Sequence, residues 1–153
     1  MGKGEAKKMR SIDHDRETAV FHPFKPGMKK LFGELEAEVM EIVWRVPDRL
    51  ITVREVLDEL NKSKDYAYTT IMTVMSNLAK KSVLLVEKNG QAYSYRAAMD
   101  KENYTRTMVG KIIDQLLADF SEPVLSHFAK ALEKGALPEN LAEKIEKAKK
   151  EEA

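Results

Sequence analysis

Residues 68–96, YTTIMTVMSNLAKKSVLLVEKNGQAYSYR, are the most informative stretch for the fold because the spacing of the hydrophobic residues changes within them. Apolar residues recur every three or four positions from Ile71 to Ala79, which predicts an amphipathic helix. The β-branched and aromatic residues that follow flank Asn89-Gly90, a strong signal for a tight turn between two strands. The stretch therefore predicts a helix followed directly by a β-hairpin.

Two more helices are expected before this stretch. The segment from Glu34 to Val46 carries its apolar residues on one helical face, and Pro47 ends it. Thr52 and Glu55 have the spacing of a capping box, in which each side chain accepts the backbone N–H of the other residue at the start of a helix. Three helices and then a hairpin is the order of a winged helix-turn-helix.

The sequence after the hairpin predicts helices with wide apolar faces. Asp100 is a candidate N-cap of the first helix, and Ser121 with Pro123 marks the start of a second, which Gly135 stops. Helix faces this apolar must be covered by another element. We expect that the two helices pack on each other and that a symmetric second copy of the chain covers the rest. The expected dimerisation residues are the large ones of this region: Tyr104, Met108, Ile112, Leu116, Leu117, Phe120, Val124 and Phe128.

The chain of 153 residues thus divides into four expected segments. Residues 1–31 form a basic arm without a sustained period, which we expect to be flexible. Residues 32–98 form the winged helix-turn-helix, residues 99–135 a C-terminal helical dimerisation region, and residues 136–153 an amphipathic helix with a charged tail. The expected fold class is mostly α with a small β-hairpin wing (α+β).

The composition excludes several kinds of function. There are no cysteines, which removes disulfides and thiolate metal sites and fits a reducing cytoplasm. No apolar run approaches the ~20 residues of a membrane span. The three histidines, His14, His22 and His127, are scattered, and the sequence has no phosphate-binding loop or metalloprotease motif. We expect a cytoplasmic protein that is not an enzyme and that uses no cofactor or metal.

The third helix carries short polar side chains at the start of the face opposite its apolar stripe and basic side chains at the end of that face. Threonine and serine side chains fit close to base edges in the major groove of DNA, and a threonine methyl can pack on that of thymine. Residues 66–98 carry four Lys/Arg against one Glu, although the net charge of the whole chain is only +1. The alternative is a helix face that only water covers.

The hairpin supplies the candidate wing, with two polar residues beside its turn. Tyr93 and Tyr95 alternate to one side, with Val83 and Leu85 as candidate partners, and packing in the core is the preferred interpretation for Tyr95. We expect double-stranded DNA to contact the third helix and the wing through these residues: Tyr68, Thr69, Thr70, Thr73, Ser76, Asn77, Lys80, Lys81, Lys88 and Gln91.

Four motifs stand in order along the chain: LEAEVMEIVW at 35–44, TVREV at 52–56, YTTIMTVM at 68–75 and GQAYSY at 90–95. With this spacing the sequence resembles the penicillinase-repressor family (BlaI/MecI, with copper-responsive CopY relatives). The resemblance implies a homodimeric, sequence-specific repressor of transcription that binds an inverted-repeat operator. It also implies that Thr69, Thr70 and Thr73 are the DNA-reading residues.

Members of this family are often released when a membrane-bound sensor metalloprotease triggers cleavage in the dimerisation helix. The Asn–Phe bond that is cut aligns with Lys111-Ile112 here, so the sequence does not predict cleavage by the same sensor. Asn77 and Gln91 stand where the family usually has arginine, and Ser82 where it commonly has glycine. The lack of cysteine excludes copper sensing through thiolates.

Two alternatives stay open beside the repressor. In the first, the fold is the same but a small ligand between the winged helix and the dimer helices changes the affinity for DNA. In the second, the winged helix is a protein-interaction module that docks through the apolar stripe at 104–120.

Overall fold

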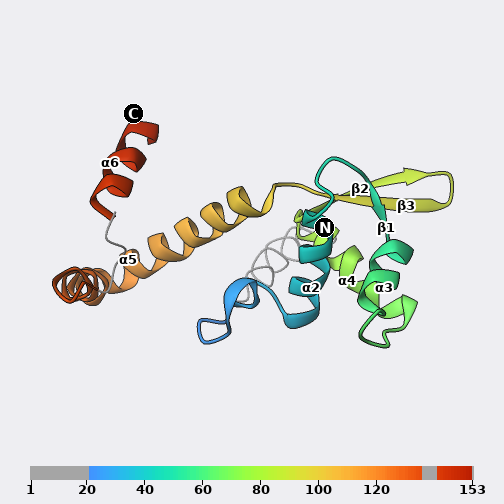
Figure 1. Cartoon of the computed structure of the whole chain (residues 1–153), viewed down its shortest axis with the longest axis horizontal. Helices are drawn as coiled ribbons and strands as arrows, with labels where there is room; N and C mark the ends of the chain where they lie inside the picture. The colour runs from blue at the N-terminus through green and yellow to red at the C-terminus, as the bar shows by residue number, and fades with distance from the viewer. Residues whose placement is uncertain (1–20, 136–140, 153) are drawn as a thin grey trace, which may run out of the picture. The chain divides into compact units, whose positions relative to one another are not determined.

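The computed structural model describes residues 21–135 and 141–152. The elements in chain order are η1 (Gly27–Lys30), α2 (Glu34–Trp44), β1 (Ile51–Thr52), α3 (Val53–Leu60), α4 (Tyr68–Lys80), β2 (Leu84–Asn89), β3 (Ala92–Ala97), α5 (Lys101–Glu133) and α6 (Leu141–Glu152). The chain divides into two units, one ending at Thr105 and the other beginning at Arg106. In the first unit, α2, α3 and α4 lie together and the β2–β3 hairpin projects from them (Figure 1).

The helices of the first unit begin and end at local sequence signals. The Thr52 Oγ1 accepts the Glu55 N–H at 3.2 Å, and a Glu55 carboxylate oxygen accepts the Thr52 N–H at 2.8 Å. The predicted capping box at the start of α3 is therefore confirmed. α2 ends at Trp44, shortly before Pro47, and α4 begins at Tyr68. These boundaries agree with the predicted helices to within two residues.

The hydrophobic core of the first unit lies between the three helices and the sheet. Each helix buries the apolar stripe that its periodicity predicted, because only that stripe faces the other elements. The buried hydrophobic residues are Phe32, Ala37, Val39, Met40, Ile42, Val43, Ile51, Val53, Val56, Leu57, Leu60, Ile71, Met75, Leu78, Leu84 and Tyr95. The prediction of a mostly helical winged helix-turn-helix is confirmed.

The sheet is antiparallel, with the strand order β1-β3-β2. Gly90 has a φ of 66° and is the first of the two residues that join β2 to β3. A positive φ at this turn position favours glycine, because a side chain would clash with the backbone. The hairpin signal at Asn89-Gly90 is thus confirmed, with Asn89 ending β2 rather than lying inside the turn.

The register of the hairpin decides which side chains meet. Tyr95 lies opposite Val86, and Tyr93 shares the same face of the sheet because it is two residues away. The prediction that Val83 and Leu85 are the partners of the tyrosines is wrong, since Leu85 neighbours Val86 and points to the opposite face. Tyr95 is 5% exposed, so its predicted place in the core is confirmed.

Within residues 21–31, Met28 and Leu31 pack against the core of the first unit, whereas Phe24 is 99% exposed. The Met28 sulfur in η1 lies 3.6 Å from the hydroxyl oxygen of Thr105 near the start of α5. The adjoining Phe32 is 3% exposed, and its ring stacks on Tyr104 with the centroids 5.1 Å apart. Met28, Leu31 and Phe32 follow no regular spacing in the sequence, so their packing is seen only in the folded structure. Residues 1–20 of the predicted arm lie outside the described residues.

The second unit comprises α5 from Arg106 onward and the whole of α6. Asp100 accepts the Asn103 N–H at 2.8 Å and caps α5 as predicted. Phe120 interrupts α5 with a φ of −138° and a ψ of 47°, so a second helical stretch starts beside Ser121 as the sequence predicts. Gly135, with a φ of 61°, follows the end of α5. In the described ranges, no helix combines the length and the apolar character needed to cross a bilayer.

Candidate nucleic-acid interface

α4 buries one face and leaves the opposite face outside the core. Ile71, Met75 and Leu78 are fully buried. The predicted contact residue Ser76 is half-buried, and six others on this helix are exposed: Tyr68, Thr69, Thr70, Thr73, Asn77 and Lys80. The polar face is therefore available to a partner, as the prediction requires.

The threonines on this face differ in what they offer to a ligand. The Thr73 hydroxyl donates to the Thr69 carbonyl oxygen at 2.8 Å, so its proton is already used. Thr73 presents its methyl group and oxygen lone pairs, which suit a thymine methyl or a base amino group. The Thr70 hydroxyl makes no hydrogen bond within the part of the chain that the structure describes, so it can donate or accept.

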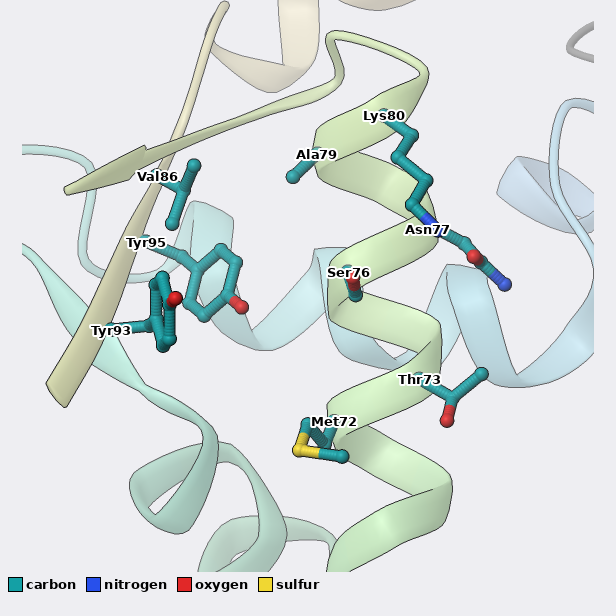
Figure 2. A pocket seen from close by; sticks show the side chains of 9 residues that line it. All are labelled: Met72, Thr73, Ser76, Asn77, Ala79, Lys80, Val86, Tyr93 and Tyr95. Atoms are coloured by element: carbon teal, nitrogen blue, oxygen red, sulfur yellow. The ribbon is translucent and has the colours of Figure 1, made fainter. Parts of the chain in front are cut away.

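A groove of about 620 Å³ runs between α4 and the hairpin. Figure 2 shows Met72 and Ser76 of α4 on the side of Val86 and Tyr93 of the hairpin, whereas Thr73 lies at the outer rim. Met72, Val86 and Tyr93 are 42%, 47% and 50% exposed, which is high for large hydrophobic residues. A partner that covers the polar face of α4 therefore also borders an apolar groove.

The tip of the hairpin carries the two predicted wing residues. The Lys88 ammonium lies 5.6 Å from the centroid of the Tyr93 ring, a distance suited to a cation–π interaction. Gln91 is exposed in the turn. Both residues are open to solvent at the end of the wing.

The basic residues of the winged helix divide into two groups by their partners. Within residues 33–98, five of the nine Lys/Arg side chains pair with a glutamate: Arg45, Arg49, Lys62, Lys64 and Lys81. The other four have no ion pair in the described part of the chain: Arg54, Lys80, Lys88 and Arg96. One of these four lies beside the start of α4, one at its end, and two on the hairpin. Arg54 and Lys80 thus place unpaired positive charge at the two ends of α4, and Lys88 places it on the same face of the hairpin as Tyr93, whereas Arg96 lies on the opposite face of the sheet.

Lys81 behaves differently from the other predicted contacts. Its ammonium lies 3.1 Å from the Glu36 carboxylate of α2, and the two side chains are only 23% and 22% exposed. An ammonium held in this way neutralises a half-buried acid and is less available to a phosphate. A DNA contact by Lys81 stays a prediction.

Arg54 is a candidate contact that sequence analysis missed. It lies in residues 32–65, which carry five Lys/Arg against nine Asp/Glu, and no local pattern there shows that it reaches α4. The structure places its guanidinium carbon 5.0 Å from the centroid of the Tyr68 ring. Its place between Val53 and Val56 of the buried stripe indicates an outward side chain, but the contact with α4 depends on how α3 packs.

The candidate dimerisation residues on the second unit are partly or fully exposed. Leu116, Phe120 and Phe128 are 38%, 59% and 49% exposed. The remaining four on this unit are half-buried: Met108, Ile112, Leu117 and Val124. No residue of α5 is buried, so this apolar face has no cover within the described residues.

Tyr104 does not belong to that face. Its ring packs against Phe32 and Trp44 of the first unit, at centroid distances of 5.1 and 5.7 Å. Burial, and secondarily the nearby Glu36 carboxylate, raises the pKa of Tyr104 to about 12. The prediction of a dimer contact was based on periodicity, which continues from α5 into its first turn although that turn packs on the winged helix.

In the described ranges, no group of three or more His, Asp or Glu side chains is placed to hold a metal ion.

Three helices, a two-stranded wing and an exposed polar helix with unpaired cations around it define this chain as a winged helix-turn-helix protein. Residues 32–149 match the model of the penicillinase repressor family. The chain belongs to that family.

Curated relatives match the chain over part of their length. The transcriptional regulator BlaI of Mycobacterium tuberculosis strain H37Rv is 34% identical over 84 residues, which cover 55% of this chain and 58% of that protein. The penicillinase repressor of Bacillus licheniformis is 33% identical over 79 residues, which cover 50% of this chain and 60% of that protein. The chain thus spans less than two thirds of these relatives.

Solved structures are also similar to part of the chain. The DNA-binding domain of the repressor BlaI is 32% identical with a TM-score of 0.42, covering 48% of this chain and 87% of that one. The monomeric form of Bacillus licheniformis BlaI in complex with the blaP half-operator is 32% identical with a TM-score of 0.39, at the same coverage.

Proposed function

We propose that this chain is a sequence-specific transcriptional repressor that binds double-stranded operator DNA in the cytoplasm. The observation that carries the proposal is the exposed polar face of α4 with unpaired cations at both ends and on the wing. Cations without an acidic partner attract phosphates without first breaking an ion pair. The α4 side chains closest to base edges are then short and neutral, as direct reading in the major groove requires.

The repressor acts as a homodimer on an inverted repeat. The support is the apolar face of α5, which leaves Leu116, Phe120 and Phe128 exposed. Large exposed apolar faces of this kind are typical of interfaces between protein chains. A twofold axis would repeat α4 on the second half-site, about 34 Å away along the duplex.

The deciding experiment is a gel-shift titration of the chain with a duplex from its own promoter region, against a random duplex of equal length. The promoter duplex should win, and its affinity should fall steeply with salt because bound cations release counterions from the DNA. If no sequence outcompetes random DNA, the repressor function is wrong.

Light scattering with and without DNA tests the alternative of a protein-interaction module. A monomer whose mass does not change when DNA is added would favour that function.

A small ligand as the release signal has one supporting observation. A hollow of about 330 Å³ opens beside the Glu36–Lys81 ion pair and is also lined by His22, Phe32 and Tyr104. It joins the end of α4 to the first turn of α5, so an occupant would contact both. A ligand-induced rise in melting temperature together with a change in DNA affinity would support this trigger.

Cleavage within α5 by a sensor metalloprotease pathway is the other release signal. Its support is family membership, and Lys111 is exposed at the aligned bond. Loss of DNA binding after cleavage of α5, with no effect of ligands, would favour it.

A further inference from the structure

Arg54 packs on an aromatic ring and has no acidic partner in the described residues. It lies in the first turn of α3, and its side chain is exposed. Its guanidinium carbon is 5.0 Å from the centroid of the Tyr68 ring, and Tyr68 is the first residue of α4. The ring is 41% exposed, so the pair lies at the surface where α3 meets the reading helix.

The hydrogen-bond donors of Arg54 are not used within the described residues. Its neighbour Glu55 is occupied by Arg49 at 2.9 Å and by the Thr52 N–H at 2.8 Å. A guanidinium over an aromatic ring keeps its N–H groups around the edge of its plane, free for a bidentate acceptor. A phosphate group has the geometry that such a fork binds.

The two preceding arginines give the contrast. Arg45 lies 3.4 Å from the Glu59 carboxylate, and Arg49 lies 2.9 Å from that of Glu55. Each would have to leave its acid before it could bind another anion. Arg54 has no ion pair to break before it binds an anion. Its contact with the Tyr68 ring already restricts its rotamers, so less side-chain entropy is lost on binding.

We propose that Arg54 binds a backbone phosphate of the DNA at the start of α4 and that Tyr68 is its positioning residue. This inference rests on the proposed function, because the phosphate belongs to the operator. α4 has 13 residues and is therefore about 20 Å long. Arg54 at its start and Lys80 at its end would hold the same helix at two separated phosphates.

The test measures affinity against salt concentration for the full chain with two duplexes, the promoter region and a random sequence of equal length. The plot of log affinity against log salt has a negative slope, and Arg54→Ala should make it less steep by about 1 on both duplexes. The effect is the same for both because a phosphate contact carries no sequence information. The wild-type advantage over this variant should then shrink about three- to fourfold between 50 and 200 mM salt. Arg45→Ala removes an arginine that has an acidic partner, and its slope should equal the wild-type slope.

Tyr68 is tested by rescue. Tyr68→Phe keeps the ring and should bind DNA more tightly than Tyr68→Leu, which loses the ring. In the Arg54→Ala background, Tyr68→Leu should have little further effect, because the ring would act through the arginine. Circular dichroism melts confirm that each variant is folded.

The outcomes separate the inference from the proposed function. If the wild type binds DNA with a steep salt dependence and Arg54→Ala has the slope of Arg45→Ala, the inference is wrong and the repressor stands. Equal losses from Tyr68→Leu with and without Arg54 would show that Tyr68 acts by itself. If the wild type binds no DNA at low salt, the proposed function fails and the inference fails with it.

Discussion

At the scale of single residues, Ser82 shows how a departure from the family pattern appears in the backbone. It has a φ of 61°, in the left-handed region that favours glycine. Its N–H bonds to the Ala79 carbonyl at 3.0 Å and that of Val83 to the Leu78 carbonyl at 3.0 Å, which is the Schellman arrangement at a helix end. The family commonly has glycine here because the chain must turn from α4 into β2.

Ser82→Gly should therefore stabilise the protein. Relief of the left-handed strain outweighs the extra freedom of glycine in the unfolded chain, and we expect a gain of about 1 kcal/mol in the free energy of unfolding. Urea titration should show a higher midpoint with an unchanged slope. Ser82→Ala keeps the β-carbon and should give no gain. A glycine variant that is no more stable than the wild type would contradict this reasoning.

Tyr104 predicts a dependence of stability on alkaline pH. Its pKa is about 12 in the folded chain against an ordinary value of 10.0, because burial disfavours the phenolate. Between these pH values the unfolded chain loses this proton more readily than the folded chain, so the free energy of unfolding falls as pH rises. Below pH 10 the group has no such effect.

Tyr104→Phe removes this titration and keeps the ring. Denaturant unfolding measured from about pH 8 to pH 11 should show a shallower fall for the variant than for the wild type. The two proteins are compared by slope, so a constant difference in stability between them does not matter. Parallel curves would rule out Tyr104 as the source.

At the scale of elements, α4 combines a fully buried stripe with an exposed polar one. Ile71, Met75 and Leu78 attach the helix to the core, so its outer residues can change without loss of the fold. The wing extends the same surface, because the hairpin register turns Tyr93 toward the groove beside α4. The proposed DNA-binding surface is thus composed of two elements that the same core holds in place.

Thr70→Ala and Thr73→Ala should leave folding intact and reduce discrimination between operator and random DNA. We expect a loss of about 1–3 kcal/mol for each base contact removed. Competition gel shifts measure this loss, and thermal melts check the fold. Because the Thr73 proton is used internally, Thr73→Val should be milder than Thr73→Ala. Variants that discriminate as well as the wild type would exclude these threonines from base reading.

At the scale of the whole molecule, the apolar face of α5 determines the expected assembly. Its large side chains are exposed in the single chain, and burial of each in an interface contributes about 25 cal/mol per Å² of apolar surface. A dimer gives DNA two reading helices for one association event, which raises affinity for an inverted repeat.

Leu116→Asp combined with Phe128→Asp should produce a folded monomer. Light scattering should report twice the chain mass for the wild type and the chain mass for this variant, because a charge in an apolar interface is strongly unfavourable. The variant should keep its affinity for a half-site and lose the advantage of the full repeat. Ser126→Asp, a change at an exposed polar position of α5, is the control and should stay dimeric. A monomeric wild type would contradict the proposed assembly.

The order of the elements, the capping box at Thr52, the hairpin and the polar face of α4 could all be predicted from the residue pattern. These features depend on neighbours within a few residues, and local spacing reports such neighbours directly. The partners of Tyr93 and Tyr95 were predicted incorrectly, because they depend on the register of the opposite strand.

Which charged side chains lack an acidic partner could not be predicted from the residue pattern, because it depends on how the helices pack. Lys81 pairs with Glu36 across 45 residues, while Arg54 lies over Tyr68 with no acidic partner in the described residues. Tyr104 likewise packs on Phe32 rather than on the apolar face of α5. Local pattern determines which side of a helix is buried, but the partner of an exposed side chain is set by how the helices pack together.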